Sequence, residues 1–425
     1  MQVIGSERFQ WETLREYQRN PITGSWLVDV TPYLKRNYAP LAERLVALTS
    51  HLEEIPRVLE EARGHLRAEL PRPIVETARE VYEGYLSFYT TSLPQTVGSA
   101  GDGVLGARFQ RALDEAIEAL KAHLGFLQGA QERATDDVSI GEANFVGLLR
   151  TGELVDLPLA RLIALGEAEL ARLAEDVRET AARIDPLAGP QEVMTQLGHQ
   201  HPAAEALVAE TAVIVEALRR FLVEREIVTL PGDVRPIVAE TPPFDRWAFA
   251  MMDTAGPLET AATESFYYIT PPEPDWPPER REQWLSKFDY ATLKATSIHE
   301  AYPGHFVHFL HIRGAPTMVS KALTSYSFVE GWAHYCEEMM LEAGVDSTPN
   351  FRLAYLGEAL TRQVRYLVAI RMHAGDLSVD EAEQMFERHA YMEPVTARKE
   401  AVRGTFDPGY LNYTLGKFMM RRLRD

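Results

Sequence analysis

Apolar residues recur at every third or fourth position through much of the first half of the chain, which is the feature that most restricts its fold. The stretches with this spacing are 38–70, 107–130, 158–184 and 203–224. Charged residues occupy the positions between them, as on the solvent face of an amphipathic helix. The pattern predicts a bundle of long helices over residues 1–225, with a Gly-rich loop at 98–106.

The pattern changes near residue 226, where short runs typical of strands appear. They are Ile227–Leu230, Pro236–Ala239 and the aromatic-rich run Ser265–Thr270. Helical patterning resumes near residue 286 and continues to the C-terminus. We therefore expect a mostly α protein with a small, mostly antiparallel sheet, divided into 1–225 and 226–425. No flexible linker is visible near 225, so the alternative is one continuous domain.

Five of the 12 histidines lie between positions 299 and 334, whereas the chain has one cysteine, Cys336. A metal site in this chain must therefore use His, Asp and Glu. The run His299-Glu300-Ala301-Tyr302-Pro303-Gly304-His305 is similar to the zinc motif H-E-x-x-H, in which two histidines lie one helical turn apart.

The second histidine of this run comes six residues after the first, rather than four. Six residues of straight helix turn the chain by about 600°, so His299 and His305 would not share a face. A break at Pro303-Gly304 would let them share a metal. In the alternative interpretation one helix ends at Tyr302, another starts at Gly304, and His305 and His308 are ordinary surface residues.

A second segment, Glu330-Gly331-Trp332-Ala333-His334, begins 25 residues after His305. On a helix, Glu330, His334 and Glu337 or Glu338 recur on one side. Catalytic zinc often has three protein ligands, of which two His and one Glu are a known set, so Glu330 is a candidate third ligand. The alternative is an exposed, charged helix.

These two segments together resemble the DUF885 family of bacterial proteins, which carries an H-E-x-x-P-G-H motif. The resemblance implies a zincin-like helical metallopeptidase fold, distantly similar to helical gluzincins of the M3 and M32 type, with the sheet beside the active-site helix. It implies that His299, His305 and Glu330 bind one Zn²⁺ per chain and that Glu300 is the catalytic base. The first half of the chain would form one wall of a cleft.

The resemblance extends to the C-terminal region. Glu400, Arg403 and the run Asp407–Lys417 resemble late motifs of the family, and the match makes Tyr413 the candidate for stabilising the oxyanion. The nearby Tyr410 is the alternative. The segment 362–373 resembles an arginine-rich helix that lines the cleft.

Further roles follow as hypotheses. His334 would hold a metal ligand in place through a hydrogen bond. Arg371, His373 or Arg365 would contact substrate carbonyls or a carboxylate, although arginines on helices are mostly solvated. The run containing Tyr268 would pair with an extended peptide, or would be a buried strand without a ligand.

The remaining histidines have simpler interpretations. His308 and His311 are alternative metal ligands to His305, and Cys336 is expected to be a packed core residue. We expect the others to be scattered on the surface: His51, His65, His123, His199, His201 and His389.

The net charge of −19 makes nucleic acid an unfavourable partner. No apolar run is long enough to span a bilayer, and the first residues lack the features of a signal peptide, so we expect a cytoplasmic protein without a membrane partner. The expected function is a zinc peptidase acting on short peptides. The alternatives are a hydrolase of non-peptide amides or esters and an inactive helical binding scaffold. The sequence does not predict an oligomeric state.

Overall fold

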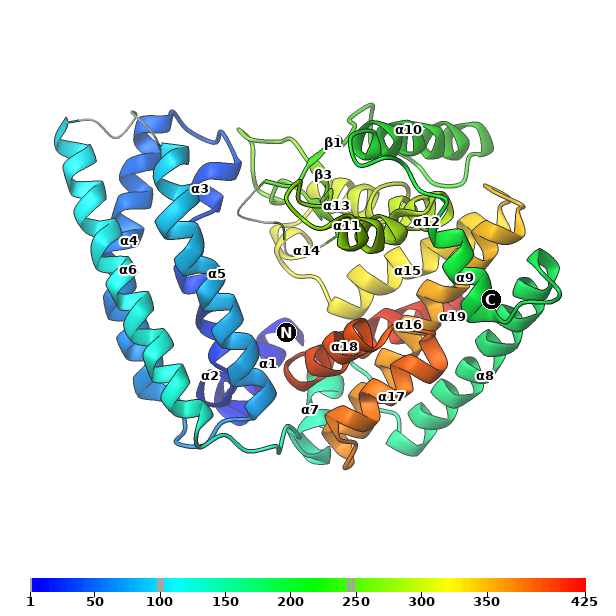
Figure 1. The fold of residues 1–425 in the computed structure, drawn as a ribbon, viewed down its shortest axis with the longest axis horizontal. Coiled ribbons are helices and arrows are strands. Elements are labelled where there is room, and N and C mark those ends of the chain that lie inside the picture. The colour runs from blue at the N-terminus through cyan, green and yellow to red at the C-terminus, as the bar shows by residue number, and fades with distance from the viewer. Residues whose placement is uncertain (1, 98–102, 243–245, 247–248) are drawn as a thin grey trace. The chain divides into compact units, whose positions relative to one another are not determined.

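The computed structural model describes residues 2–97, 103–242, 246 and 249–425, which form two compact units (Figure 1). One unit consists of Ile4–Asn144 and Thr260–Ala262, and the other contains Phe145–Glu259 and Thr263–Asp425. The change of sequence pattern near residue 225 therefore falls inside the second of these units. Of the predicted Gly-rich loop, residues 98–102 lie outside the described part, and Gly103–Gly106 begin a helix.

The unit that spans Ile4–Asn144 is built on three long helices, α4 (Leu41–His65), α5 (Arg72–Val97) and α6 (Gly103–Gln131). Shorter elements precede them: α1 (Gln2–Arg8), η1 (Phe9–Leu14), α2 (Glu16–Arg19), η2 (Pro21–Val28) and α3 (Pro32–Lys35). The helices predicted at 38–70 and 107–130 are confirmed as α4 and α6. Their periodic leucines, such as Leu52 and Leu120, are fully buried where the two helices pack together.

Most helices belong to the other unit. They are α7 (Glu142–Gly152), α8 (Leu159–Ile184), α9 (Pro190–Gly198), α10 (Leu207–Arg225), α11 (Pro278–Leu285), α12 (Tyr290–Glu300), α13 (His305–Arg313), α14 (Met318–Ala322), α15 (Tyr326–Glu342), α16 (Pro349–Ala374), α17 (Val379–Ala390), α18 (Pro394–Phe406) and α19 (Asn412–Arg424), with 3₁₀ turns η5 (Ser286–Phe288) and η6 (Pro408–Leu411). The helices α8 and α10 confirm the predictions at 158–184 and 203–224.

Helix α16 is central to this unit because it is buried on nearly every side. It packs against α8, α12, α17, α18 and α19, and most of its residues from Phe351 to His373 are buried. A helix that is apolar around most of its circumference must be surrounded in this way. Of its arginines, Arg362 and Arg365 are largely buried, whereas Arg352 and Arg371 remain partly exposed to solvent.

The sheet has three strands in the order β1-β3-β2: β1 (Ile237–Glu240), β2 (Ala250–Asp253) and β3 (Phe266–Ile269). Strand β3 pairs in parallel with β1, Ile237 opposite Phe266, and antiparallel with β2, Ala250 opposite Ile269. The expectation of a mostly antiparallel sheet was wrong, because the long connection from β1 to β3 permits a parallel pair. The predicted strand at Ile227–Leu230 is irregular chain, and β2 was missed.

The core beside the sheet is formed by α10, β3, α12, α13 and α15. Tyr267, Ile298, Phe306 and Met340 are fully buried within it, as is Cys336, in agreement with the prediction for the cysteine. No helix of the described part is both long and apolar enough to cross a membrane.

Candidate metal centre

A break between α12 and α13 brings His299 and His305 together. Helix α12 ends at Glu300 and α13 begins at His305, with Gly304 as its N-cap residue. The Gly304 N–H donates to the Ile298 carbonyl at 3.0 Å, and a Cβ at Gly304 would lie 1.7 Å from the His299 carbonyl oxygen. Only glycine permits this approach. The break was predicted, but His305 and His308 are 9% and 7% exposed, so their interpretation as surface residues was wrong.

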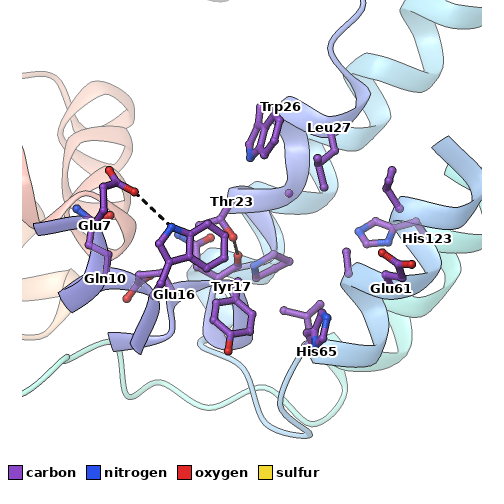
Figure 2. Close-up of a pocket in the computed structure, with 17 residues that line it drawn as sticks. Glu7, Gln10, Glu16, Tyr17, Thr23, Trp26, Leu27, Glu61, His65 and His123 are labelled. Carbon is purple, nitrogen blue, oxygen red and sulfur yellow. Dashed lines mark hydrogen bonds between the residues drawn. The ribbon is translucent and has the colours of Figure 1, made fainter. Parts of the chain in front are cut away.

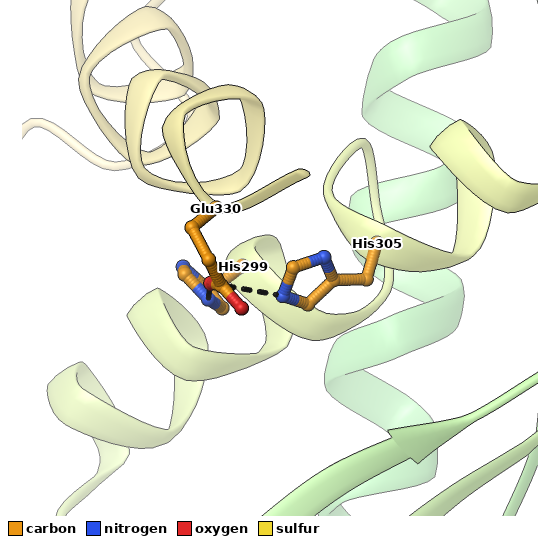
Figure 3. A group of neighbouring side chains, drawn as sticks. All are labelled: His299, His305 and Glu330. Atoms are coloured by element: carbon orange, nitrogen blue, oxygen red, sulfur yellow. Dashed lines mark ion pairs between the residues drawn. The ribbon is translucent and has the colours of Figure 1, made fainter. Parts of the chain in front are cut away.

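Glu330 of α15 completes a group of three potential ligands. Its Oε2 lies 3.5 Å from His299 Nε2 and 3.5 Å from His305 Nε2, and one ligand atom from each residue lies within 4.8 Å of the others. Figure 3 shows the carboxylate pointing toward both imidazoles. Within the described chain no further residue joins this group. His308 instead packs on Phe328, and the His311 Nε2 bonds to the Thr229 carbonyl at 2.9 Å.

The helix that carries Glu330 is fixed by close contacts on both sides. The Trp332 indole N–H donates to the Pro303 carbonyl at 2.9 Å, which ties α15 to the break between α12 and α13. On the other side, a Cβ at Gly331 would lie 2.4 Å from the Gly416 Cα of α19. The glycines of two distant sequence motifs therefore form one helix crossing, which sets the position of Glu330.

Glu337 lies behind His299 and orients it. Its Oε1 lies 2.7 Å from His299 Nδ1, and its Oε2 lies 3.3 Å from His334 Nδ1. Arg362 of α16 contacts the same carboxylate at 3.2 Å. A carboxylate on Nδ1 keeps the proton there and leaves Nε2 free to bind a metal. His334 thus contacts Glu337, and Glu337 in turn contacts His299, so the two histidines are linked through this carboxylate.

Burial and ion pairing oppose each other in this group. Burial favours the neutral form of His299, but the carboxylates of Glu330 and Glu337 outweigh it and raise the pKa of His299 to about 9. Burial likewise favours neutral Glu330, yet the two imidazoles hold the pKa of Glu330 well below its usual range. Burial and the nearby Lys417 lower the pKa of His334 to about 3, so this ring is neutral at pH 7. The carboxylates of Glu330 and Glu337 therefore favour positive charge at His299.

Tyr413 of α19 lies beside the three residues. Its ring stacks on His299 with centroids 6.3 Å apart. Three guanidinium groups face the same ring at 5.4–6.0 Å, those of Arg365, Arg362 and Arg403. Arg365 also makes two 2.7 Å bonds to Glu400, so its charge is already paired. The structure thus brings Tyr413 and Arg365 to the site, with Arg365 supporting the tyrosine.

The other predicted contact residues lie elsewhere in this unit. Tyr410 is fully buried, and a Cβ at Gly404 would lie 2.4 Å from its hydroxyl. His373 is also fully buried, with Nε2 2.7 Å from the Gly404 carbonyl. Arg371 pairs with Glu167 at 2.6 Å. The described contacts of these three side chains include none of the three potential ligands.

Tyr268 belongs to the middle strand of the sheet, so the expected pairing of this strand with a peptide is not available. Both edges of β3 are occupied, by β1 and β2. Among the described residues β2 has no strand partner on its other edge, and its Met252 N–H donates to Glu300 Oε2 at 3.0 Å. Glu300, at the end of α12, therefore connects the histidine motif to the sheet.

Two of the three separations between the candidate ligand atoms match those around a tetrahedral zinc ion. Zinc–ligand bonds of 2.0–2.2 Å place neighbouring ligand atoms about 3.4 Å apart in a tetrahedron, and the two N–O separations to Glu330 are 3.5 Å. The buried Glu330 Oε2 and His305 Nδ1 have no hydrogen-bond partner in the described structure. The sequence places Glu337 on the same side of the helix as Glu330 but did not indicate that it orients His299. Its spacing of seven residues from Glu330 on the same helix is the signal that points to it.

Comparison with known proteins places the chain in a family. A family model described as "Bacterial protein of unknown function (DUF885)" matches residues 5–425. The chain belongs to the DUF885 family. The expected family membership is confirmed, and the motif residues His299–His305 and Glu330 lie within the matched region of this DUF885 protein.

Two solved structures share the fold of this DUF885 protein. One is "a putative lipoprotein of unknown function" from Shewanella oneidensis, with a TM-score of 0.80 and 21% identity over 100% of this chain and 79% of that chain. The other is "the putative lipoprotein from Colwellia psychrerythraea", with a TM-score of 0.72 and 16% identity over 90% of this chain and 69% of that chain. No curated protein matches the chain.

Proposed function

We propose that this DUF885 protein is a zinc-dependent hydrolase with a zincin-like site that cleaves short peptides. The observation that carries the proposal is the trio of His299, His305 and Glu330, with Glu337 hydrogen-bonded to the far nitrogen of His299. Two His and one Glu leave a fourth position for water in catalytic zinc sites. A bound zinc ion would supply Lewis acidity to the water and to the substrate carbonyl.

The side chains around the trio support peptide hydrolysis. Glu300 follows His299 directly and would accept the proton of the attacking water, then pass it to the leaving amine. The Tyr413 hydroxyl would donate to the oxyanion that forms on the attacked carbonyl. The Met252 N–H would hold Glu300 in position until substrate arrives.

Strand β2 gives the proposal a substrate geometry. The edge of β2 that faces away from β3 has no strand partner in the described chain. Met252 on that edge contacts Glu300, the proposed base. An extended peptide paired with this edge would have its backbone beside Glu300. We therefore favour peptides over other amides and esters as substrates.

We also propose a cytoplasmic location for the protein, which cell fractionation tests.

Metal analysis of the purified full chain tests the metal site. We expect one zinc per chain, retained in His311→Gln and lost in His305→Gln, since both histidines lie on α13 but only His305 belongs to the trio. Absence of zinc after reconstitution would exclude the metal site and favour an inactive scaffold. Incubation of the zinc-loaded chain with a peptide library then tests the reaction. Hydrolysis of aryl esters and amides without peptide cleavage would instead identify a hydrolase of non-peptide amides or esters.

A further inference from the structure

A cavity of about 630 Å³ lies in the unit that spans Ile4–Asn144. The segment 7–27 forms one side of it, and α4 and α6 form the other. The rings of Tyr17, Trp26, His65 and His123 border it (Figure 2), as does that of Trp11. Its volume lies within the range of about 300–1,000 Å³ that is typical of small-molecule sites.

The imidazole of His123, on α6, borders the cavity and is unpaired within the described part of the chain. The side chain is 1% exposed, and neither imidazole nitrogen has a hydrogen-bond partner in the described structure. Burial, together with the nearby Arg63, lowers the pKa of His123 to about 4, so the ring is neutral at pH 7. A neutral imidazole offers one donor and one acceptor. Buried polar groups are nearly always satisfied, so an unpaired ring at a cavity wall indicates a ligand group. The expectation that His123 lies on the surface was wrong, because the charge-free face of α6 packs inward.

The charged residues of the cavity are acidic. Glu7, Glu16 and Glu61 line it, and no Lys or Arg is found among its described lining residues. Arg57 pairs with Glu61 at 2.8 Å, and Arg19 pairs with Glu16 at 3.4 Å, but neither arginine lines the cavity. The interior therefore presents carboxylates and aromatic faces, a combination that attracts organic cations and disfavours anions.

We propose that this cavity binds an organic amine with an aromatic body, whose ammonium group meets the carboxylates and whose neutral polar end bonds to His123. The ring of such a ligand would pack among Trp11, Tyr17 and Trp26. Trp11 and Trp26 are 57% and 68% exposed, and a ligand would cover part of that surface. The site is separate from the metal centre and does not depend on the proposed hydrolase activity.

Calorimetric titration of the full chain with three related probes tests the ligand class. Tyramine has both the ammonium and the hydroxyl group, phenethylamine lacks the hydroxyl, and 3-(4-hydroxyphenyl)propionate replaces the ammonium with a carboxylate. We expect tyramine to bind with a Kd near or below about 1 mM, as for ligands of this size. The carboxylate probe should bind at least about tenfold more weakly because the acidic cavity repels it. Equal binding of tyramine and 3-(4-hydroxyphenyl)propionate would overturn the proposal. So would the absence of tyramine binding at about 10 mM.

A matched pair of variants tests the position of the cation. Arg57 pairs at 2.8 Å with both Glu54 and Glu61, and only Glu61 lines the cavity. Replacing either glutamate by Gln removes one of the two ion pairs of the same arginine. We expect Glu61→Gln to weaken tyramine binding by about three- to fivefold, the size of one partly exposed charge interaction. Glu54→Gln should leave the affinity unchanged. Equal effects of the two variants would contradict binding in this cavity.

His123→Phe tests the polar end of the ligand while conserving ring volume. In the unmodified chain tyramine should bind about tenfold more tightly than phenethylamine, because its hydroxyl satisfies the imidazole. In the variant the two amines should bind equally. Circular dichroism establishes that the variant is folded. Comparing two ligands on the same variant cancels any general loss of affinity that the substitution causes. Persistence of the tyramine preference in folded His123→Phe would overturn the role of His123.

Discussion

Gly331 of α15 and Gly416 of α19 are in direct backbone contact. A Cβ at Gly331 would lie 2.4 Å from the Gly416 Cα, and a Cβ at Gly416 would lie 1.8 Å from the Ser327 carbonyl oxygen. Glu330 and Tyr413 are close neighbours of these glycines along their helices. The crossing of the two helices therefore fixes a proposed metal ligand and a proposed catalytic hydroxyl in one step.

Gly331→Ala should destabilise the protein by about 2–3 kcal/mol, because the added methyl group forces the two backbones apart. Gly357→Ala on α16 is the control, since its Cβ would make an ordinary contact of 3.7 Å with Met194. Alanine in a helix interior is favoured over glycine by about 1 kcal/mol, so the control should be neutral or stabilising. Thermal unfolding midpoints measure both. Equal midpoints would show that the helices separate without cost.

Glu337→Gln should weaken zinc binding by about 10- to 100-fold, because the amide no longer holds the proton on His299 Nδ1 as a carboxylate does. Glu338→Gln is the control for the loss of a buried carboxylate. Glu338 pairs with Lys417 at 2.9 Å and with Arg421, and its described contacts do not include His299. The control should lose stability and keep its zinc affinity, measured by competition with a chelator. A similar loss of affinity in both variants would refute the specific role of Glu337.

Glu300→Gln should lower the turnover of a cleaved peptide by about 10²–10⁴-fold, the usual contribution of a general base. The zinc content should stay at one per chain, because Glu300 is not in the trio of potential ligands. Single-turnover kinetics with the zinc-loaded variant would measure the effect. Unchanged turnover would mean that another group accepts the proton.

Tyr413→Phe should lower kcat by about 10²–10³-fold, the effect of removing one oxyanion donor, with little change in KM. Tyr410→Phe removes a hydroxyl from the same segment, and that hydroxyl is buried without a partner in the described structure. This control should keep its kcat. Steady-state kinetics of the two variants distinguish the tyrosines. A fall in kcat in Tyr410→Phe but not in Tyr413→Phe would assign stabilisation of the oxyanion to Tyr410.

The stability of the protein should depend on His123 between about pH 6.5 and pH 4. Its pKa is lowered to about 4 in the folded chain, whereas an unfolded histidine has a pKa of about 6.5. The unfolded state therefore binds the proton first as the pH falls. The ring destabilises the folded state progressively, by up to about 3 kcal/mol at pH 4.

Denaturant unfolding of the unmodified chain and of His123→Phe, measured at pH 7 and pH 4.5, checks this dependence. Histidines such as His308 and His334 also have lowered pKa values, so both proteins should lose stability in acid. The loss should be smaller in the variant. Equal losses in the two proteins would show that His123 takes up a proton in the folded state without a cost in stability.

The sequence predicted several of the long helices, though not α5, and the three clustered residues, because their signals are local. Apolar spacing identified α4, α6, α8 and α10, and the Pro303-Gly304 pair correctly indicated a break between the histidines. The small sheet was predicted less well, since strand order and direction depend on contacts between distant segments. Strand β2 is only four residues long and lies close to residues with little alternation, so its pattern is weak.

The surroundings of the site depended on tertiary packing and were predicted in part. Arg365 and Arg371 look alike in sequence, yet one faces Tyr413 and Glu400 and the other pairs with Glu167. Likewise His373 and His334 are both buried, but only His334 contacts Glu337. Which buried histidine meets which carboxylate depends on how α15, α16 and α18 pack, and a single sequence does not carry that information.

The contact between Glu337 and His299 has a consequence for how the chain folds. Glu337 reaches His299 only after α15 has docked on α12, and Arg362 reaches Glu337 only after α16 has joined them. An unfolded chain would offer a metal the same side chains without this support, and would hold it weakly. Tight metal uptake would then report the completion of folding, so a stopped-flow zinc indicator could follow the assembly of these three helices in real time.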